Sequence, residues 1–142
     1  MITRKKYTTK LPDKPEFCNF DLLNQPMHLD ELGGKKLREL TFVAFDTEIT
    51  GLKPLEGDET IFIAGIKVVD GEVREGDEFT GIVNPGCSIS KASIRLHGIT
   101  DDIMANESDI RTVIPAFHEW VGDAVLVTHN AAFDMKFLKL KQ

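Results

Sequence analysis

Two carboxylates stand two residues apart at the point where an apolar stretch of strand length stops. Residues 42–45 are apolar, and Asp46 and Glu48 follow them. In an extended chain, side chains i and i+2 point the same way, so both carboxylates face one point. Two adjacent carboxylates repel each other unless a cation lies between them, and hard divalent ions such as Mg²⁺ prefer carboxylate oxygens. The alternative is a surface Asp and Glu, one of which caps a turn.

A second group of polar residues, His129–Asp134, follows another apolar stretch of strand length. Asn130 is a plausible N-cap for a helix that begins at Ala131. Asp134 then falls in the first turn, where the helix dipole favours a carboxylate. If the two strands lie parallel and adjacent, Asp134 points to the same sheet edge as Asp46, where open α/β sheets bind ligands. The alternative is an ordinary strand–helix turn with an acid in its first turn.

The elements that must position these residues form a predicted α/β sheet. Strands are predicted at residues 41–45, 61–69, 72–83 and 124–128. Asp70-Gly71 is a hairpin signal that makes the second and third strands antiparallel. Continuous apolarity predicts that the first strand is buried on both faces. Helices are predicted at residues 90–96 and 101–104, from an N-cap at Ser108 to Val121, and from 131 onward.

The length of 142 residues is that of one ordinary domain. Residues 1–39 are polar, with three prolines and Gly33-Gly34, and read as an N-terminal arm; residues 40–142 read as the folded domain. No apolar stretch approaches the ~20 residues that a membrane helix needs. The first six residues are not followed by the apolar segment of a secretory signal. We therefore expect a cytoplasmic protein without membrane contact.

The net charge of −6 is unevenly distributed. Residues 1–40 carry eight Lys/Arg and six Asp/Glu, whereas residues 41–142 carry nine and seventeen. The acidic part offers no broad basic face for a nucleic-acid duplex. If it acts on nucleic acid, we expect it to touch few phosphates and to use cations as intermediaries.

Together, the two acidic groups resemble the motifs of a known enzyme family. Residues 42–52 resemble the first motif of the DEDD 3′–5′ exonucleases, in the group of the proofreading epsilon subunit of bacterial DNA polymerase III. Similar order and spacing are found in Val83–Pro85, His97–Thr100 and His129–Leu138. The resemblance covers about residues 40–140. It implies an RNase H-like fold, with a mixed sheet of three antiparallel strands and then a parallel strand with helices.

The resemblance also implies a reaction and its cofactors. The family hydrolyses phosphodiester bonds at the 3′ ends of nucleic acids with two divalent ions, Mg²⁺ or Mn²⁺; one ion activates water and both stabilise the developing charge. By motif match, Asp46 and Glu48 would bind metal, and Asp134 would complete the catalytic cluster directly or through water. The implied partners are a single-stranded 3′ end of DNA or RNA and a DNA polymerase or repair complex.

Substrate contacts follow from the same motif match. The backbone of Thr47 and Ile49 would meet the terminal nucleotide, with Leu52 wedged near its base. Ile49 replaces a threonine that is usual in the family, but only its backbone is required. Asn130 would lie beside the substrate strand. His97 is a candidate substrate contact, although a loop histidine is more often structural.

One family motif is missing from these 142 residues. It is a His-x-x-x-x-Asp segment that supplies a metal ligand and the general base, and neither His nor Asp occurs after Asp134. His129 and Asp134 have that spacing, but the preceding strand, Asn130 and Phe133 identify the second motif, so His129 is not assigned as the base. We expect a sheet truncated before its last strand and helix, with an incomplete metal site, little activity and an exposed edge able to self-associate.

Two other classes of function are weighed against this one. The first is a non-catalytic RNase H-like binding module that keeps a partial metal site. The second is a haloacid-dehalogenase phosphatase, whose Asp-x-Asp-x-Thr motif is approached by Asp46–Thr50. That interpretation, like a receiver-type acidic site, leaves His129–Asp134 unexplained.

Overall fold

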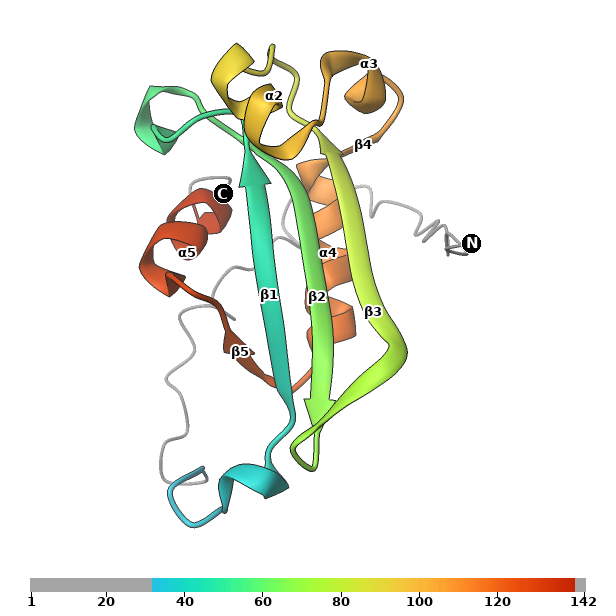
Figure 1. Cartoon of the computed structure of the whole chain (residues 1–142). Helices are drawn as coiled ribbons and strands as arrows, with labels where there is room; N and C mark the ends of the chain where they lie inside the picture. Colours follow the sequence, from blue (N-terminus) through green and yellow to red (C-terminus); the bar gives the residue numbers. More distant parts are fainter. Residues whose placement is uncertain (1–31, 140–142) are drawn as a thin grey trace.

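The chain folds into a mixed sheet with its two longest helices packed on one face and two shorter helices at one end of the sheet (Figure 1). The computed structural model describes residues 32–139. Within these residues the sheet has five strands in the order β4-β3-β2-β1-β5. The β1–β2 and β2–β3 pairs are antiparallel, whereas β5 runs parallel to β1 and β4 runs parallel to β3. The predicted mixed α/β sheet is confirmed.

Three long strands form the body of the sheet: β1 (Phe42–Ile49), β2 (Thr60–Val69) and β3 (Glu72–Asn84). The edge strands are β4 (Ser108–Asp109) and β5 (Val125–Val127). The helices are α2 (Lys91–His97), α3 (Asp101–Met104), α4 (Ile110–Val121) and α5 (Ala131–Lys139), with 3₁₀ turns at Leu37–Glu39 and Pro54–Glu56. Asp70 and Gly71 both have positive φ, as a two-residue hairpin turn requires, so the predicted hairpin is confirmed.

Short polar side chains fix where the helices begin. The Ser90 hydroxyl accepts a hydrogen bond from the Ser93 amide at the start of α2, and Gly98, with φ 74°, ends that helix. The predicted N-cap of α4 at Ser108 is wrong, because Ser108 pairs with Val83 in the short strand β4. Asp109 is the N-cap instead, and its carboxylate accepts from the Arg111 amide at 2.7 Å.

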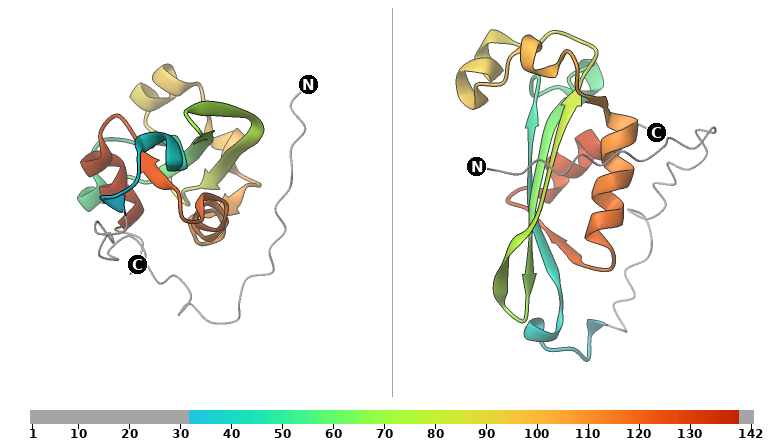
Figure 2. Two further views of the ribbon diagram at one scale, coloured as in Figure 1. Left: turned by 90° about the horizontal axis from the view of Figure 1, so that it is seen from below. Right: turned by 90° about the vertical axis from the view of Figure 1, so that its right-hand side faces the viewer.

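The main core lies between the sheet and the helices α4 and α5. Figure 2 shows α4 and α5 on the same side of the sheet. The buried side chains between them come from three strands and both helices: Val43, Phe45, Ile63, Phe79, Val83, Val113, Phe117, Val121 and Leu138. Phe117 of α4 is central, because its ring lies 5.7 Å from that of Phe45 and 5.2 Å from that of Phe79. This packing fixes β1 against α4.

The prediction that β1 is buried on both faces is wrong. Val43 and Phe45 are buried under the helices, but Phe42 and Ala44, which point to the opposite face, are only half-buried. On that face their neighbours in the sheet are Val68 and Ile66 of β2. Further along the same face Asp46 is exposed and Glu48 is half-buried.

The remaining predictions concern the edges of the sheet, the N-terminal arm and membrane helices. Val127 of the edge strand β5 is 46% exposed. Self-association through an edge strand stays a prediction. The N-terminal arm, predicted over residues 1–39, lies mostly outside the described residues, so its boundary also stays a prediction. Within residues 32–139, every helix is too short or too polar to cross a membrane.

Candidate active site

The two predicted acids of β1 share the face of the sheet that is opposite to α4 and α5. Asp46 lies across from Ala64 of β2, and Glu48 lies across from Phe62. Asp46 is exposed and Glu48 is half-buried. The ladder with β2 shifts register after Glu48, so the pair stands where the regular strand ends. The structure therefore brings these two carboxylates to one face, as the i, i+2 spacing predicts.

Asp134 approaches the same strand from the other face. Its side chain is 5% exposed, and its Oδ1 accepts a hydrogen bond from the Thr47 hydroxyl at 2.7 Å. Its Oδ2 accepts from the Thr128 hydroxyl at 2.9 Å. Thr47 lies across from the fully buried Ile63, on the helix-covered face. The carboxylate of Asp134 thus contacts the residue between the two acids and reaches it from the core side.

The first turn of α5 places Asp134 there. The carbonyl of Asn130 accepts hydrogen bonds from the amides of Phe133 and Asp134, so the helix begins directly after Asn130, as predicted. Leu138, one turn further along, packs in the main core. Because positions i and i+4 share a helix face, Asp134 is directed toward the sheet together with Leu138.

Sequence reasoning missed Thr50, which holds the loop between β1 and β2. Thr50 is 2% exposed, and its hydroxyl donates to the Asp58 carboxylate at 3.2 Å and accepts from the Glu59 amide at 2.9 Å. Its carbonyl accepts from the Ser93 hydroxyl at 2.8 Å. Asp58 also accepts from the amide of Lys53 at 2.8 Å. The only feature of the sequence that points to this loop-holding role is the position of the threonine, two residues after the Asp-x-Glu motif.

The residues predicted to contact substrate have different surroundings. Leu52 is 75% exposed on the loop after β1, and Asn130 is exposed at the turn before α5. Ile49 is half-buried and lies across from Thr60. His97 ends α2, where its Nδ1 accepts a hydrogen bond from the Ile99 amide at 3.1 Å. That contact gives His97 a structural role in shaping the turn, and its substrate role stays a prediction.

The acids fit a divalent metal only in part. Carboxylate oxygens are suitable ligands, and Asp46 and Glu48 share a face. However, within residues 32–139 no three His, Cys, Asp or Glu side chains are grouped so as to hold a metal ion. Asp134 is not grouped with the pair as a third ligand, and both of its oxygens accept hydrogen bonds from threonine hydroxyls. Its predicted participation in metal binding, directly or through water, stays a prediction.

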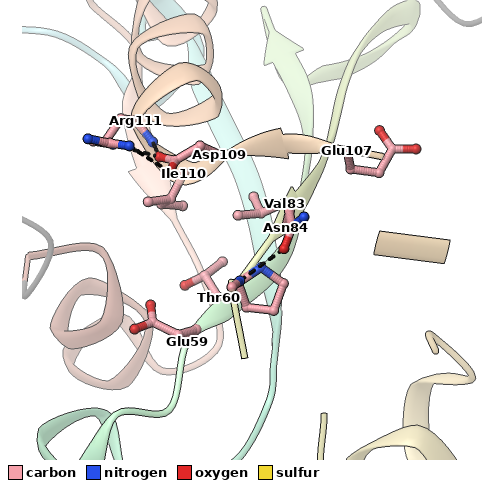
Figure 3. A pocket seen from close by; sticks show the side chains of 10 residues that line it. Glu59, Thr60, Val83, Asn84, Glu107, Asp109, Ile110 and Arg111 are labelled. Carbon is pink, nitrogen blue, oxygen red and sulfur yellow. Dashed lines mark hydrogen bonds and ion pairs between the residues drawn. The ribbon is translucent and has the colours of Figure 1, made fainter. Parts of the chain in front are cut away.

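A pocket of about 450 Å³, which none of these acids lines, lies between the start of β2, the end of β3 and the start of α4 (Figure 3). Its walls include Glu59, Glu107 and Asp109. The guanidinium of Arg111, which also lines it, makes two hydrogen bonds to Asp109, at 2.9 and 3.0 Å. Three carboxylates and one paired cation disfavour a phosphate, so this pocket is not assigned to a nucleic-acid substrate.

Comparison with known proteins places this arrangement in a family. A family model described as Exonuclease matches residues 43–142. A DNA polymerase III subunit epsilon-like protein of Rhodobacter capsulatus is 44% identical over 124 residues, which are 87% of this chain and 18% of that protein. The DNA polymerase III PolC-type of Bacillus subtilis is 45% identical over 104 residues, which are 73% of this chain and 7% of that protein. The chain thus spans less than a fifth of either relative.

Solved structures agree with this assignment. Exonuclease X, solved in complex with 5′ overhanging duplex DNA, matches with a TM-score of 0.58 and 30% identity over 68% of this chain and 52% of its own. Exonuclease I of E. coli, solved with a dA16 oligonucleotide, shares the fold with a TM-score of 0.60 and 19% identity, over 69% of this chain and 22% of its own. The predicted RNase H-like fold and the resemblance to the epsilon-type exonucleases are confirmed, and the chain belongs to the exonuclease family.

Proposed function

We propose that this chain is the 3′–5′ exonuclease domain of a proofreading or repair nuclease, and that it hydrolyses phosphodiester bonds at single-stranded 3′ ends. The observation that carries the proposal is the pair Asp46 and Glu48, which share the face opposite to α4 and α5 at the carboxyl end of β1. The similarity to an epsilon-like protein and to PolC-type polymerases favours DNA over RNA as the substrate. A non-catalytic module is not favoured by these similarities.

In this proposal Asp46 and Glu48 bind the metal, Asp134 completes the cluster directly or through water, and the ion is Mg²⁺ or Mn²⁺. Exonucleases of this family generally use divalent ions. An ion held there would activate water and would stabilise the charge that develops on the scissile phosphate. With two carboxylates grouped and no His or Asp after Asp134, we expect weak metal binding and slow hydrolysis by these 142 residues alone.

The substrate strand, in this proposal, lies across the end of β1. The exposed Leu52 would contact the terminal base, and the backbone of Thr47 and Ile49 would contact the terminal nucleotide. Asn130, exposed before α5, would lie beside the strand. The excess of acidic residues in the folded part agrees with a substrate held at one end by few phosphate contacts.

The proposed setting is a cytoplasmic DNA polymerase or repair complex, as the polymerase relatives suggest. A second copy of the chain, paired through an edge strand of the sheet, is a further proposed partner. Pairing of two copies in this way would cover backbone groups that an edge strand leaves unpaired.

The test uses a 5′-labelled single-stranded oligonucleotide and Mn²⁺. It compares this chain with a chimaera that continues after Gln142 with the residues that follow the aligned segment of the Rhodobacter capsulatus relative. We expect slow shortening from the 3′ end by the chain alone. We expect the added residues to supply the missing His-x-x-x-x-Asp motif and with it the general base. Because a general base contributes roughly 10²–10⁴-fold to the rate of hydrolysis, the chimaera should be at least about 10²-fold faster.

Matched substitutions decide the outcome. Asp46→Ala should abolish shortening by both proteins, whereas Asp123→Ala, at an exposed acid between α4 and β5, should leave it unchanged. A chimaera that folds but does not shorten the oligonucleotide would favour the non-catalytic module. Rapid, Asp46-dependent digestion by the chain alone would instead show that the general base lies within it, and His129 would become the candidate.

A further inference from the structure

Helix α2 is attached to the chain directly after the two acids of β1. The Ser93 hydroxyl donates to the Thr50 carbonyl at 2.8 Å, and the Ser90 amide donates to the same carbonyl at 3.4 Å. Figures 1 and 2 show α2 on the side of the sheet opposite to α4. Asp46 and Glu48 also face away from α4, because they alternate with the core residues of β1. α2 therefore lies on the side of the acids and at their end of the strand.

The segment that contains α2 differs in charge from the rest of the folded part. Residues 79–100 contain no Asp or Glu, whereas residues 41–142 carry seventeen. The segment has two Lys/Arg residues, Lys91 and Arg95, and both are exposed. They are four residues apart on α2, so they share one face and lie about 6 Å apart along the helix axis. α2 thus presents two cations in one row.

These two cations also differ from several others in having no carboxylate partner. Within residues 32–139, neither Lys91 nor Arg95 forms an ion pair. Four other cations of the same part lie 2.8–3.6 Å from a carboxylate: Lys53, Lys67, Arg74 and Arg111. Lys53 is the cation on the loop after β1, and its partner is Glu56. A phosphate can therefore bind Lys91 and Arg95 without displacing a carboxylate.

We propose that α2 is a contact surface for the substrate strand, in which Lys91 and Arg95 bind phosphates on the 5′ side of the scissile bond. The inference rests on the proposed function, in which the 3′ end lies at Asp46 and Glu48. A strand that ends at these acids can continue over α2, because both lie on the same side and at the same end of the sheet. The surface supplies affinity without base preference, because phosphate contacts carry no sequence information.

Two matched double variants test the surface. The first carries Lys91→Gln and Arg95→Gln, and glutamine keeps the helix propensity of the residues it replaces. The second carries Lys35→Gln and Arg38→Gln, which remove the same charge from exposed positions before the amino end of β1. Because all four positions are exposed, each substitution should change the free energy of unfolding by less than about 0.5 kcal/mol. Thermal unfolding confirms that both variants are folded.

The measurement is the salt dependence of binding, followed by fluorescence anisotropy of a 5′-labelled single strand in Mn²⁺. A phosphorothioate at the last linkage protects this strand from hydrolysis. Each phosphate contact to a single strand contributes about 0.7 to the slope of log K against log salt, so the α2 variant should lose about 1.4. Between about 50 and 200 mM salt, the affinity of the unchanged chain should then fall about sevenfold more than that of the α2 variant. The control variant should keep the slope of the unchanged chain.

Hydrolysis by the chimaera gives a second readout. A dinucleotide without a terminal phosphate has only the scissile phosphate, so it offers none to α2. Lys91→Gln with Arg95→Gln should therefore leave kcat/KM for the dinucleotide unchanged, and should lower kcat/KM for a longer strand through a higher KM. A general defect of folding or of the metal site would instead lower kcat/KM for both substrates.

The outcomes distinguish this inference from the proposed function. An unchanged salt slope in the α2 variant, an equal loss in the control variant, or a loss seen with oligo(dT) but not with oligo(dA) would overturn the phosphate contacts. The proposed function would survive each of these results if Asp46→Ala still abolished shortening. If the strand binds through α2 but the chimaera does not shorten it, the surface stands and the proposed function fails in favour of the non-catalytic module.

Discussion

Replacing Gly51 by alanine should destabilise the loop that follows the acidic end of β1. A Cβ at this position would lie 2.5 Å from Oδ2 and 2.6 Å from Oδ1 of Asp58, so the carboxylate must move. It would then lose its hydrogen bonds from the Lys53 amide, at 2.8 Å, and from the Thr50 hydroxyl, at 3.2 Å. Hydrogen bonds to charged groups contribute about 1.5–3 kcal/mol each. Because this loop is partly exposed, we expect a total loss of about 2 kcal/mol in the free energy of unfolding.

Urea unfolding followed by far-UV circular dichroism measures this loss. Gly34→Ala is the matched control, because a Cβ there meets no atom within 4 Å. Asp58→Ala should cost about as much as Gly51→Ala, and the double variant should cost no more than either, because both changes remove the same contacts. A Gly51→Ala chain as stable as the unchanged chain would refute the reasoning, and so would strictly additive losses in the double variant.

Three further predictions concern the start of α4, the candidate substrate loop and the single tryptophan. Asp109→Ala should lower the free energy of unfolding by about 0.5–2 kcal/mol, and Ser108→Ala by less than about 0.5 kcal/mol; the reverse order in urea unfolding would contradict the observed cap. Leu52→Ala, at a 75% exposed position, should leave stability within about 0.5 kcal/mol and raise KM for the oligonucleotide in the chimaera; an unchanged KM would remove Leu52 from the proposed site. Trp120→Phe should cost less than about 1.5 kcal/mol, because it removes an exposed 2.8 Å hydrogen bond to Asp77; a loss above about 3 kcal/mol in thermal unfolding would show that this contact matters more than its exposure implies.

Local patterns were sufficient to predict most of the fold. The hairpin at Asp70-Gly71 and the helix between Ser90 and Gly98 are encoded by neighbouring residues, and both are confirmed. β4 could not be predicted, because two residues carry no periodicity and their pairing depends on where β3 ends. That pairing also moved the cap of α4 by one residue. Burial of β1 on both faces was wrongly predicted, because an apolar stretch does not show whether other elements cover one face of a strand or both.

The candidate site was predictable only where spacing along the chain determines it. The i, i+2 spacing placed Asp46 and Glu48 on one face, and the start of a helix after Asn130 placed Asp134 in its first turn. The contact between Thr47 and Asp134 joins residues 87 positions apart, so it depends on how α5 packs against the sheet. No local pattern in the sequence reports such a contact.

The alternation of side chains along β1 separates two kinds of mutational sensitivity within eight residues. Val43 and Phe45 face the core, whereas Ala44, Asp46 and Glu48 face the opposite side. Substitutions at the first set should reduce the amount of folded protein in a cell, while many at the second set should leave the amount unchanged. Selection for abundance and selection for activity therefore act on alternate positions of one strand. Asp46 and Glu48 can consequently change with little cost to folding.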